Sequence, residues 1–426
     1  MKLSISKLLI ALNCLVIIFF GSIINRMDYT TIIYMGILIV INAMYSLKYK
    51  YTRNIYWIET GYLFLILLWL INGTPIYSSV CYFIILIEEV HFFLNMFCAR
   101  HNNDDFAIKI VVWLMGLMAF YGIYEGVTQS NPLFLRLFSE NALTDYKNSF
   151  LYTYNTVGSM EESLIFAMLL SMSSIFILMM SNKRNKYFLY IVFGIAMFFT
   201  NKRSALLMWM LVYIIFELLD AWLISNKKTY AMRLLKIVFG IVIGIFILNI
   251  VKIKGNTILS LVTSKFTGLF SENSRSYMQR YGALIIALEL ILQKNSIFGF
   301  LFGNGLSSLV GNFVANRRTI TDLNFYVIDN QYITSWYDSG FVFLILCVLT
   351  CVHFIIELTK IVGDKRIAIS FRKKSLVLLI GMILVMFYSF IIDVLTWYQP
   401  IFIISFIIAL SIWNIKEAKK ECDYTK

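Results

Sequence analysis

Apolar runs long enough to cross a membrane recur along the whole chain and constrain its fold more than any other feature. A helix needs about 20 mostly apolar residues to span the hydrocarbon core of a bilayer. Segments near that length, with very little charge, occur twelve times, and the seventh is short. The predicted spans are 7–24, 31–47, 55–71, 76–97, 107–124, 159–180, 187–200, 204–224, 234–251, 339–359, 375–393 and 400–414.

The composition indicates the same class of protein. Of the 426 residues, 60% are hydrophobic and 14% are charged, which is too little charge to cover a surface facing water. We therefore predict an all-α polytopic integral membrane protein with about 12 transmembrane helices, forming a single membrane domain over residues 1–426.

Basic residues predict how the helices are oriented. Clusters of Lys and Arg follow even-numbered spans at 48–53, 183–186, 227–233, 360–374 and 416–420. The positive-inside rule puts these clusters, and both termini, in the cytoplasm. The net charge of +13 then reflects topology, and no nucleic-acid partner is predicted.

The opposite face carries two larger loops, 125–158 and 252–338. The second is a large extracytoplasmic loop inserted between the ninth and tenth spans. Within it, residues 277–292 have helical periodicity and predict a helix lying along the membrane surface. The predicted apolar face of this helix consists of Tyr281, Leu284, Ile285, Leu288 and Ile291. The glycines that follow it, from Gly299 to Gly305, predict a turn or re-entrant backbone.

One basic pair runs against the charge asymmetry. Lys202 and Arg203, after Asn201, lie between two apolar segments on the outer face. A guanidinium at a helix N-terminus, together with free backbone N–H groups, can hold a pyrophosphate. The alternative is a pair of cations facing lipid headgroups.

Two further clusters lie in the long outer loop. Arg275 and Arg280 are five residues apart, so they lie on different faces of the predicted helix, which could instead be a basic surface helix for anionic lipid. Asp329, before Asn330 and Tyr332, offers a carboxylate as a general base, and Tyr337 and Asp338 lie close by in the sequence. The alternative for this segment is an Asx turn that caps the next helix.

Other polar residues suggest less. Glu88 and Glu89 lie inside the fourth span, where a carboxylate costs roughly 2.5–3.5 kcal/mol and is usually functional or paired. They could serve a proton path or pair with a cation of another span. The position of Asp393 near Trp397 predicts that it lies in an aromatic belt. No spacing of histidines or cysteines predicts a metal site.

Three motifs resemble those of the O-antigen polymerase and O-antigen ligase family. NKRSALL at 201–207 is similar to the family's S/T-x-S-R-G/S-A-L turn. The run from Arg275 or Arg280 to Gly299 is similar to R-x-x-x-W…A-L…P-L-F-G-x-G, although the Trp is absent and Ser296 replaces the Pro. The segment from Asp329 to Phe341 is similar to H-N-x-Y-L…x-x-G-L, with Asp in place of His.

The resemblance implies a GT-C-like glycosyltransferase of the bacterial cytoplasmic membrane. Its donor would be an oligosaccharide on undecaprenyl pyrophosphate, and its acceptor a sugar hydroxyl of another lipid-linked repeat. Asp329 would be the base, and Arg203 with Arg280 would neutralise the leaving group. Lys202, Arg275, Asn330 and Tyr332 would bind substrate. The resemblance implies no cofactor and no metal; the partners would be the lipid bilayer, a flippase and a chain-length regulator.

Three alternatives to a polymerase stay open, and one of them is a structural membrane partner of a synthesis complex, against which the outward-facing arginines argue. A ligase shares these motifs but hands the glycan to a different acceptor. A transporter, such as a flippase for the lipid-linked glycan, suits twelve spans and the two intramembrane glutamates. It would be expected to show repeat symmetry and ionisable groups along a central path, whereas here the polar residues gather in one outer loop.

Overall fold

The protein is described from a computed structural model. The described residues are 4–24, 29–49, 77–100, 102–149, 154–180, 183–224, 231–235, 237–239, 252–253, 256–257, 260, 275–292, 296–315 and 328–424.

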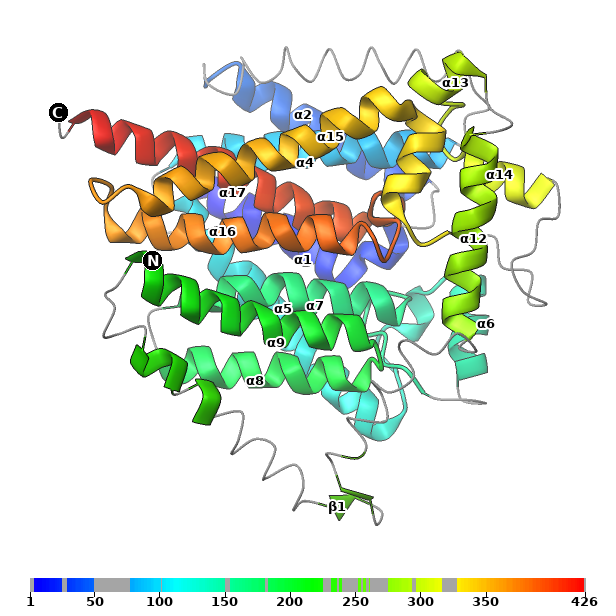
Figure 1. Ribbon diagram of the computed structural model, residues 1–426, viewed down its shortest axis with the longest axis horizontal. Coiled ribbons are helices and arrows are strands. Elements are labelled where there is room, and N and C mark those ends of the chain that lie inside the picture. Colours follow the sequence, from blue (N-terminus) through cyan, green and yellow to red (C-terminus); the bar gives the residue numbers. More distant parts are fainter. Residues whose placement is uncertain are drawn as a thin grey trace.

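Ten of the described helices run side by side and make up the body of the described part of the molecule (Figure 1). They are α1 (Ile5–Ile24), α2 (Tyr29–Ser46), α4 (Tyr77–Ala99), α5 (Asn103–Thr128), α7 (Ser163–Ile177), α8 (Lys183–Phe199), α9 (Arg203–Leu219), α15 (Gln331–Gly363), α16 (Ile369–Tyr388) and α17 (Tyr398–Tyr424). The other described helical elements lie at the ends of the bundle: η1 (Leu135–Leu137), α6 (Glu140–Ser149), η2 (Asp220–Ile224), α12 (Arg275–Leu292), α13 (Ile297–Phe302), α14 (Ser308–Ala315) and η3 (Val394–Thr396). The two-residue strands β1 (Lys252–Ile253) and β2 (Asn256–Thr257) pair antiparallel.

The all-α prediction is confirmed at the level of the described chain. A described helix overlaps each predicted span except 55–71, which lies outside the described residues, and 234–251, most of which does. Six of the described helices are long and apolar enough to cross a membrane: α1, α2, α5, α9 with its η2 extension, α15 and α17.

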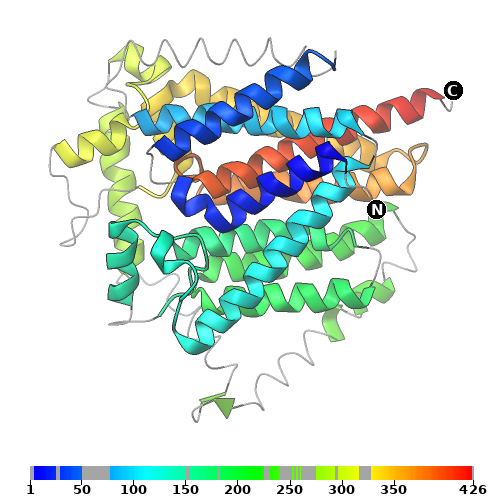
Figure 2. The same cartoon turned by 180° about the vertical axis from the view of Figure 1, so that it is seen from behind.

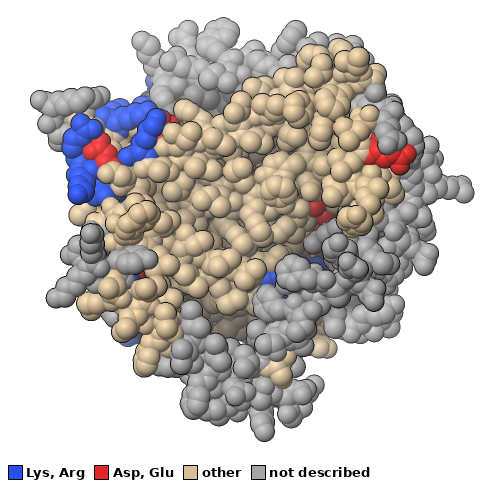
Figure 3. All heavy atoms as spheres, viewed as in Figure 1, with Lys and Arg blue, Asp and Glu red and all other residues tan. Residues whose placement is uncertain are grey.

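The surface of the bundle suits a bilayer. In Figure 3 a broad uncharged area separates Lys and Arg, gathered where α15 leads into α16 and where α17 ends, from acidic side chains at the other end. Large apolar side chains such as Leu349 and Ile356 of α15 are exposed on this surface. Apolar atoms that face outward from long helices are expected where lipid replaces water as the solvent.

α12 crosses the bundle instead of running with it. It lies across the end at which α8 joins α9 and at which α15 begins (Figures 1 and 2). This arrangement fits the prediction of a helix lying along the membrane surface.

The side of α12 that packs against the rest of the protein is not its predicted apolar face. Ala283, Ala287 and Leu290 are buried against α14 and the start of α15, whereas Tyr281 and Ile285 are 54% and 48% exposed. Small side chains allow another backbone to come close, so the alanines form the protein-facing side. The predicted apolar stripe lies mostly outside this protein-facing side, with Ile291 as the one predicted member that is buried.

Two glycines allow the backbone at the end of α13, just before α14, to pack closely against α15. Gly340 has φ 89° and kinks α15, and Gly303 has φ 87° directly opposite. A Cβ on Gly303 would lie 2.2 Å from the carbonyl oxygen of Asp338, so glycine is required at this approach. The predicted turn at 299–305 is found here, although Gly299 itself lies in α13.

Asp338 adds hydrogen bonds between α15 and the start of α14. Its carboxylate accepts hydrogen bonds from Ser307 N (2.7 Å), Leu309 N (2.8 Å) and Ser308 Oγ (3.0 Å). These groups form the first turn of α14, whose free N–H groups need acceptors. Asp338 therefore has a structural role, and it holds α14 at the end of the bundle where α15 begins.

Candidate functional site

The predicted anion site lies in the turn between α8 and α9. Asn201 adopts a left-handed conformation with φ 56°, and its side-chain amide donates to Tyr154 O (2.8 Å) and to Asn155 Oδ1 (2.9 Å). Lys202 is the N-cap of α9, and Arg203 is its first helical residue. The turn is thus anchored to the segment that precedes α7.

A buried carboxylate stabilises the segment that precedes α7. Glu125 of α5 accepts hydrogen bonds from Tyr154 OH (2.7 Å), Gly158 N (2.8 Å) and Val157 N (3.2 Å). A carboxylate with several donors is well compensated for its burial. Glu125 therefore stabilises the segment that anchors the α8–α9 turn. The sequence analysis did not identify this residue.

Arg203 is half-buried, and among the described residues it has no hydrogen bond and no ion pair. The ion pairs within the described part of the chain lie at the other end of the bundle, for example between Lys374 and Asp105 and between Lys419 and Glu357. A half-buried guanidinium at a helix N-terminus is well suited to a phosphate oxygen.

The second part of the site is the start of α15. Asp329 has φ 53° and is half-buried, and Asn330 follows as the N-cap. The Asn330 side chain accepts hydrogen bonds from Tyr332 N (3.1 Å) and Ile333 N (3.2 Å). This is the Asx cap that was the alternative interpretation of the segment. Gln331 adds anchors to the α16–α17 connection, donating from its N to Ser389 O (2.8 Å) and accepting from Leu395 N (2.8 Å).

Tyr332 is also held by the protein. Its hydroxyl donates to Met386 O (2.8 Å), and its ring centroid lies 4.4 Å from that of Phe390. The contacts of Asn330 and Tyr332 thus assign both a role in positioning α15. Their predicted role in binding substrate stays a prediction.

The structure adds a carboxyl that the sequence analysis placed in an aromatic belt. Asp393 is 3% exposed, and its Oδ1 accepts a hydrogen bond from Thr334 Oγ1 (2.9 Å). Burial, with a smaller contribution from the negative charge of nearby Asp329, raises the pKa of Asp393 to about 7. The apolar neighbours of Asp393 in the sequence, Ile392 and Val394, were the signal that it is buried.

The predicted residues share one end of the bundle but do not form one contact network. Within the described residues, no hydrogen bond or ion pair joins Arg203 to Asp329. α12 begins at Arg275, and Arg280 follows in its second turn, so both lie in the helix that crosses this end (Figure 1). The side chains of Arg275 and Arg280 fall outside the described part of the structure.

The intramembrane glutamates belong to a separate polar network. Glu89 is fully buried and accepts hydrogen bonds from Asn13 Nδ2 (2.9 Å), Tyr398 OH (3.1 Å) and Tyr34 OH. Asn42 Nδ2 donates to the carboxylate of Glu88 (2.7 Å). The donors to Glu89 are neutral side chains of α1, α2 and α17, so this network ties these helices to α4.

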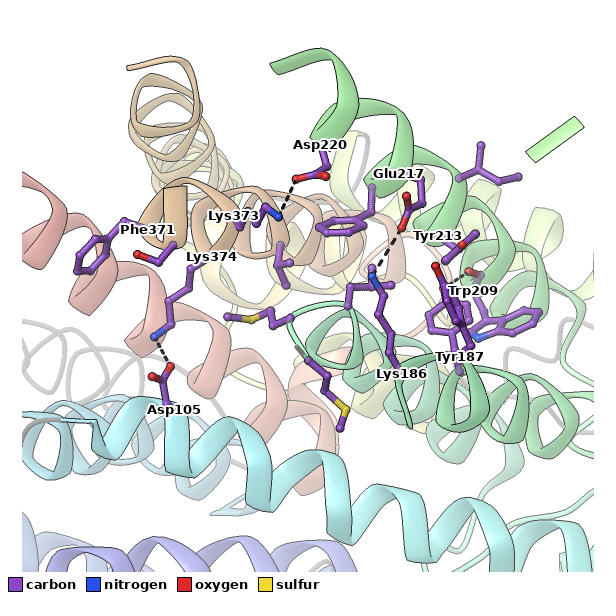
Figure 4. Close-up of a pocket in the computed structure, with 18 of the residues that line it drawn as sticks. Asp105, Lys186, Tyr187, Trp209, Tyr213, Glu217, Asp220, Phe371, Lys373 and Lys374 are labelled. Atoms are coloured by element: carbon purple, nitrogen blue, oxygen red, sulfur yellow. Dashed lines mark hydrogen bonds and ion pairs between the residues drawn. The ribbon is translucent and has the colours of Figure 1, made fainter. Parts of the chain in front are cut away.

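A large cavity in the described part of the structure lies away from every predicted site residue. It has a volume of about 1230 Å³ and opens at the basic end of the bundle, among α5, α8, α9, α16 and α17 (Figure 4). A large cavity is the usual first candidate for a binding site. The residues predicted from the sequence lie at the other end, where Arg203 has no partner among the described residues and where Asp329 lies near Asp393. Among the described residues, no group of three metal-ligating side chains lies together.

The described residues form a helical bundle with several helices long and apolar enough to span a membrane and with a cluster of polar residues at one end. No protein-family model matches the chain, and no curated protein is significantly similar to it.

Proposed function

We propose that the chain is a polymerase of surface polysaccharide such as capsule, O-antigen or exopolysaccharide. It transfers a glycan from undecaprenyl pyrophosphate to a terminal sugar hydroxyl of a lipid-linked repeat unit. The reaction takes place at the outer face of the bacterial cytoplasmic membrane, with both termini in the cytoplasm. The sequence resemblance supplies this reaction class, and the geometry at one end of the bundle supports it.

The observation that carries the proposal is the environment of Arg203. It is half-buried at the N-terminus of α9 and has no acidic partner among the described residues. It also lies at the end opposite the basic clusters, where topology alone does not account for a cation. A departing pyrophosphate supplies the anion that this position lacks.

The proposed step is a nucleophilic substitution at the anomeric carbon. The acceptor hydroxyl oxygen forms the new bond to that carbon, and Asp329 takes the hydroxyl proton. The bond between the anomeric carbon and the pyrophosphate oxygen breaks, and its electron pair leaves with undecaprenyl pyrophosphate. Arg203, Lys202 and one of Arg275 and Arg280 stabilise this anion, since cations aimed at developing charge lower the barrier.

The start of α15 supplies the orientation that such a step requires. Asn330 caps the helix, and Gln331 and Tyr332 fasten it to the α16–α17 region. Holding a base against its substrate in a fixed geometry removes much of the entropic cost of reaction. Asp393 is shielded from solvent, whereas Asp329 is half-buried. Asp329 is therefore the carboxylate that we assign to take the proton from the acceptor hydroxyl.

The proposal is tested with purified protein and the undecaprenyl-pyrophosphate-linked repeat unit extracted from the producing strain. The wild type is expected to yield a ladder of longer glycans. Arg203→Ala should lower the rate by about 10²–10³-fold, the range for loss of one oxyanion donor. Asp329→Asn should lower it by about 10²–10⁴-fold, the range for loss of a general base.

Arg136→Ala is the matched control, because Arg136 is an exposed arginine in η1 of the same outer region. It should leave the ladder unchanged. Transfer of one preformed glycan to another acceptor, without a ladder, would favour the ligase. Movement of intact lipid-linked sugar across proteoliposomes without any elongation would favour the transporter.

A further inference from the structure

The large cavity at the basic end has the shape of a site for a membrane lipid. Its apolar wall includes Trp209, which stacks on Tyr190 at 5.0 Å between centroids, and Met210. Its charged rim includes Asp220 and Lys373 (Figure 4). An apolar interior with a charged mouth suits an amphiphile better than a wholly polar solute.

The depth of the cavity corresponds to one leaflet. Trp209 lies eleven positions before Asp220 along α9 and its η2 extension. At about 1.5 Å per residue, this separation is roughly 16 Å along the helix axis. The hydrocarbon core of a bilayer is about 30 Å thick, so the cavity reaches from one interface to about its centre.

The mouth carries charges of both signs in similar number. Lys186, Arg233, Lys373 and Lys374 face Asp104, Asp105, Glu217, Asp220 and Glu417 around the opening. Several of these are already paired, for example Lys374 with Asp105 at 3.0 Å and Lys186 with Glu217 at 3.6 Å. A balanced rim gives no net attraction for a purely anionic headgroup.

The two members of one charged pair at the mouth of the cavity are too far apart for a hydrogen bond. Lys373 Nζ lies 3.9 Å from Asp220 Oδ1, and the Lys373 side chain is 50% exposed. Asp220 is 4% exposed and pairs with Arg233 through its other oxygen. Its Oδ1 is buried and accepts no hydrogen bond from the described residues. A buried carboxylate oxygen without a donor is unfavourable, so it calls for a donor from outside the described chain.

We propose that this cavity binds a zwitterionic phospholipid of the leaflet at the basic end. The phosphate contacts Lys373, the headgroup ammonium donates to Asp220 Oδ1, and an acyl chain lies along the wall formed by Tyr190, Trp209 and Met210. An anionic phospholipid such as phosphatidylglycerol satisfies Lys373 but offers Asp220 Oδ1 only a neutral hydroxyl, a weaker donor to a carboxylate than an ammonium. The proposal does not depend on the polymerase activity, since the cavity lies at the other end of the bundle.

The test is native mass spectrometry of the full-length protein released from bilayer nanodiscs. The nanodiscs contain equal amounts of phosphatidylethanolamine and phosphatidylglycerol with matched acyl chains. The wild type should retain phosphatidylethanolamine in preference. Lys373→Gln should lower its retention about two- to fivefold, as expected for one partly exposed ionic contact. Met210→Trp should lower it as well by filling the wall.

Lys360→Gln is the control, because Lys360 is an exposed lysine at the same end that lies outside the cavity. It should retain the lipid as the wild type does. Preference for phosphatidylglycerol, absence of a retained lipid, or equal retention in the wild type and both cavity variants would each overturn the proposal. Thermal unfolding of each variant shows whether a lost adduct reflects a misfolded protein.

Discussion

Replacing Asp393 by asparagine tests whether the carboxyl buried at the start of α15 is neutral in the folded protein. Burial, with a smaller contribution from the negative charge of Asp329, raises its pKa to about 7. An aspartate in an unfolded chain titrates near 3.9. The folded state therefore holds this proton more tightly than the unfolded state does.

The sign of the pH dependence follows from this difference. The stabilisation by the proton is fully present below about pH 4, declines as the pH rises, and is lost above about pH 7. A difference of about three pKa units at 1.36 kcal/mol each amounts to about 4 kcal/mol over this range. The asparagine of the variant has no proton to lose, and its amide oxygen still accepts the hydrogen bond from Thr334, so the variant should not show this decline.

The assay is thermal unfolding followed by tryptophan fluorescence in detergent, from about pH 5 to about pH 8. The Tm of the wild type should fall relative to that of Asp393→Asn as the pH rises. Asp364→Asn is the control, because hydrogen bonds from exposed Arg366 lower the pKa of Asp364 to about 2, below the range scanned. Parallel pH profiles for the wild type and Asp393→Asn would refute the reasoning.

Four further substitutions test other parts of the structure, with Gly311→Ala as the control for Gly340→Ala. Gly340→Ala puts a Cβ 2.4 Å from Leu301 O at φ 89° and should cost about 1–3 kcal/mol or more, seen as a lower Tm. Gly311→Ala meets nothing within 4 Å in α14 and should leave the Tm unchanged or higher. Glu125→Gln turns an amide N–H₂ toward backbone donors and should lower the free energy of unfolding by about 1–3 kcal/mol. Hydrogen exchange at residues 154–158 should become faster. Unchanged exchange would contradict the stabilising role assigned to Glu125. Glu89→Gln should keep the glycan ladder, whereas a transporter coupled to this carboxyl would lose its activity.

Much of the bundle could be predicted because hydrophobic run length is a local property. α1, α2 and α9 lie where the apolar runs put them, and their ends follow the nearby polar residues. The face that α12 buries could not be read in this way. An interfacial helix meets protein on one side and lipid on the other, and both accept apolar residues. The small side chains Ala283 and Ala287, rather than the larger ones, mark the protein side.

The three carboxylates near the start of α15 show where sequence reasoning ends. Asp338 caps α14, about 30 residues earlier in the chain, and Asp393 is shielded beneath Thr334. Neither contact can be inferred from neighbouring residues, since each depends on tertiary packing. Once both are assigned, Asp329 is the member of the three that is half-exposed, and its left-handed backbone sets it outside the helix that follows. Asp338 and Asp393 thus have structural contacts that explain their positions, whereas the role of Asp329 as a base stays a prediction of the resemblance.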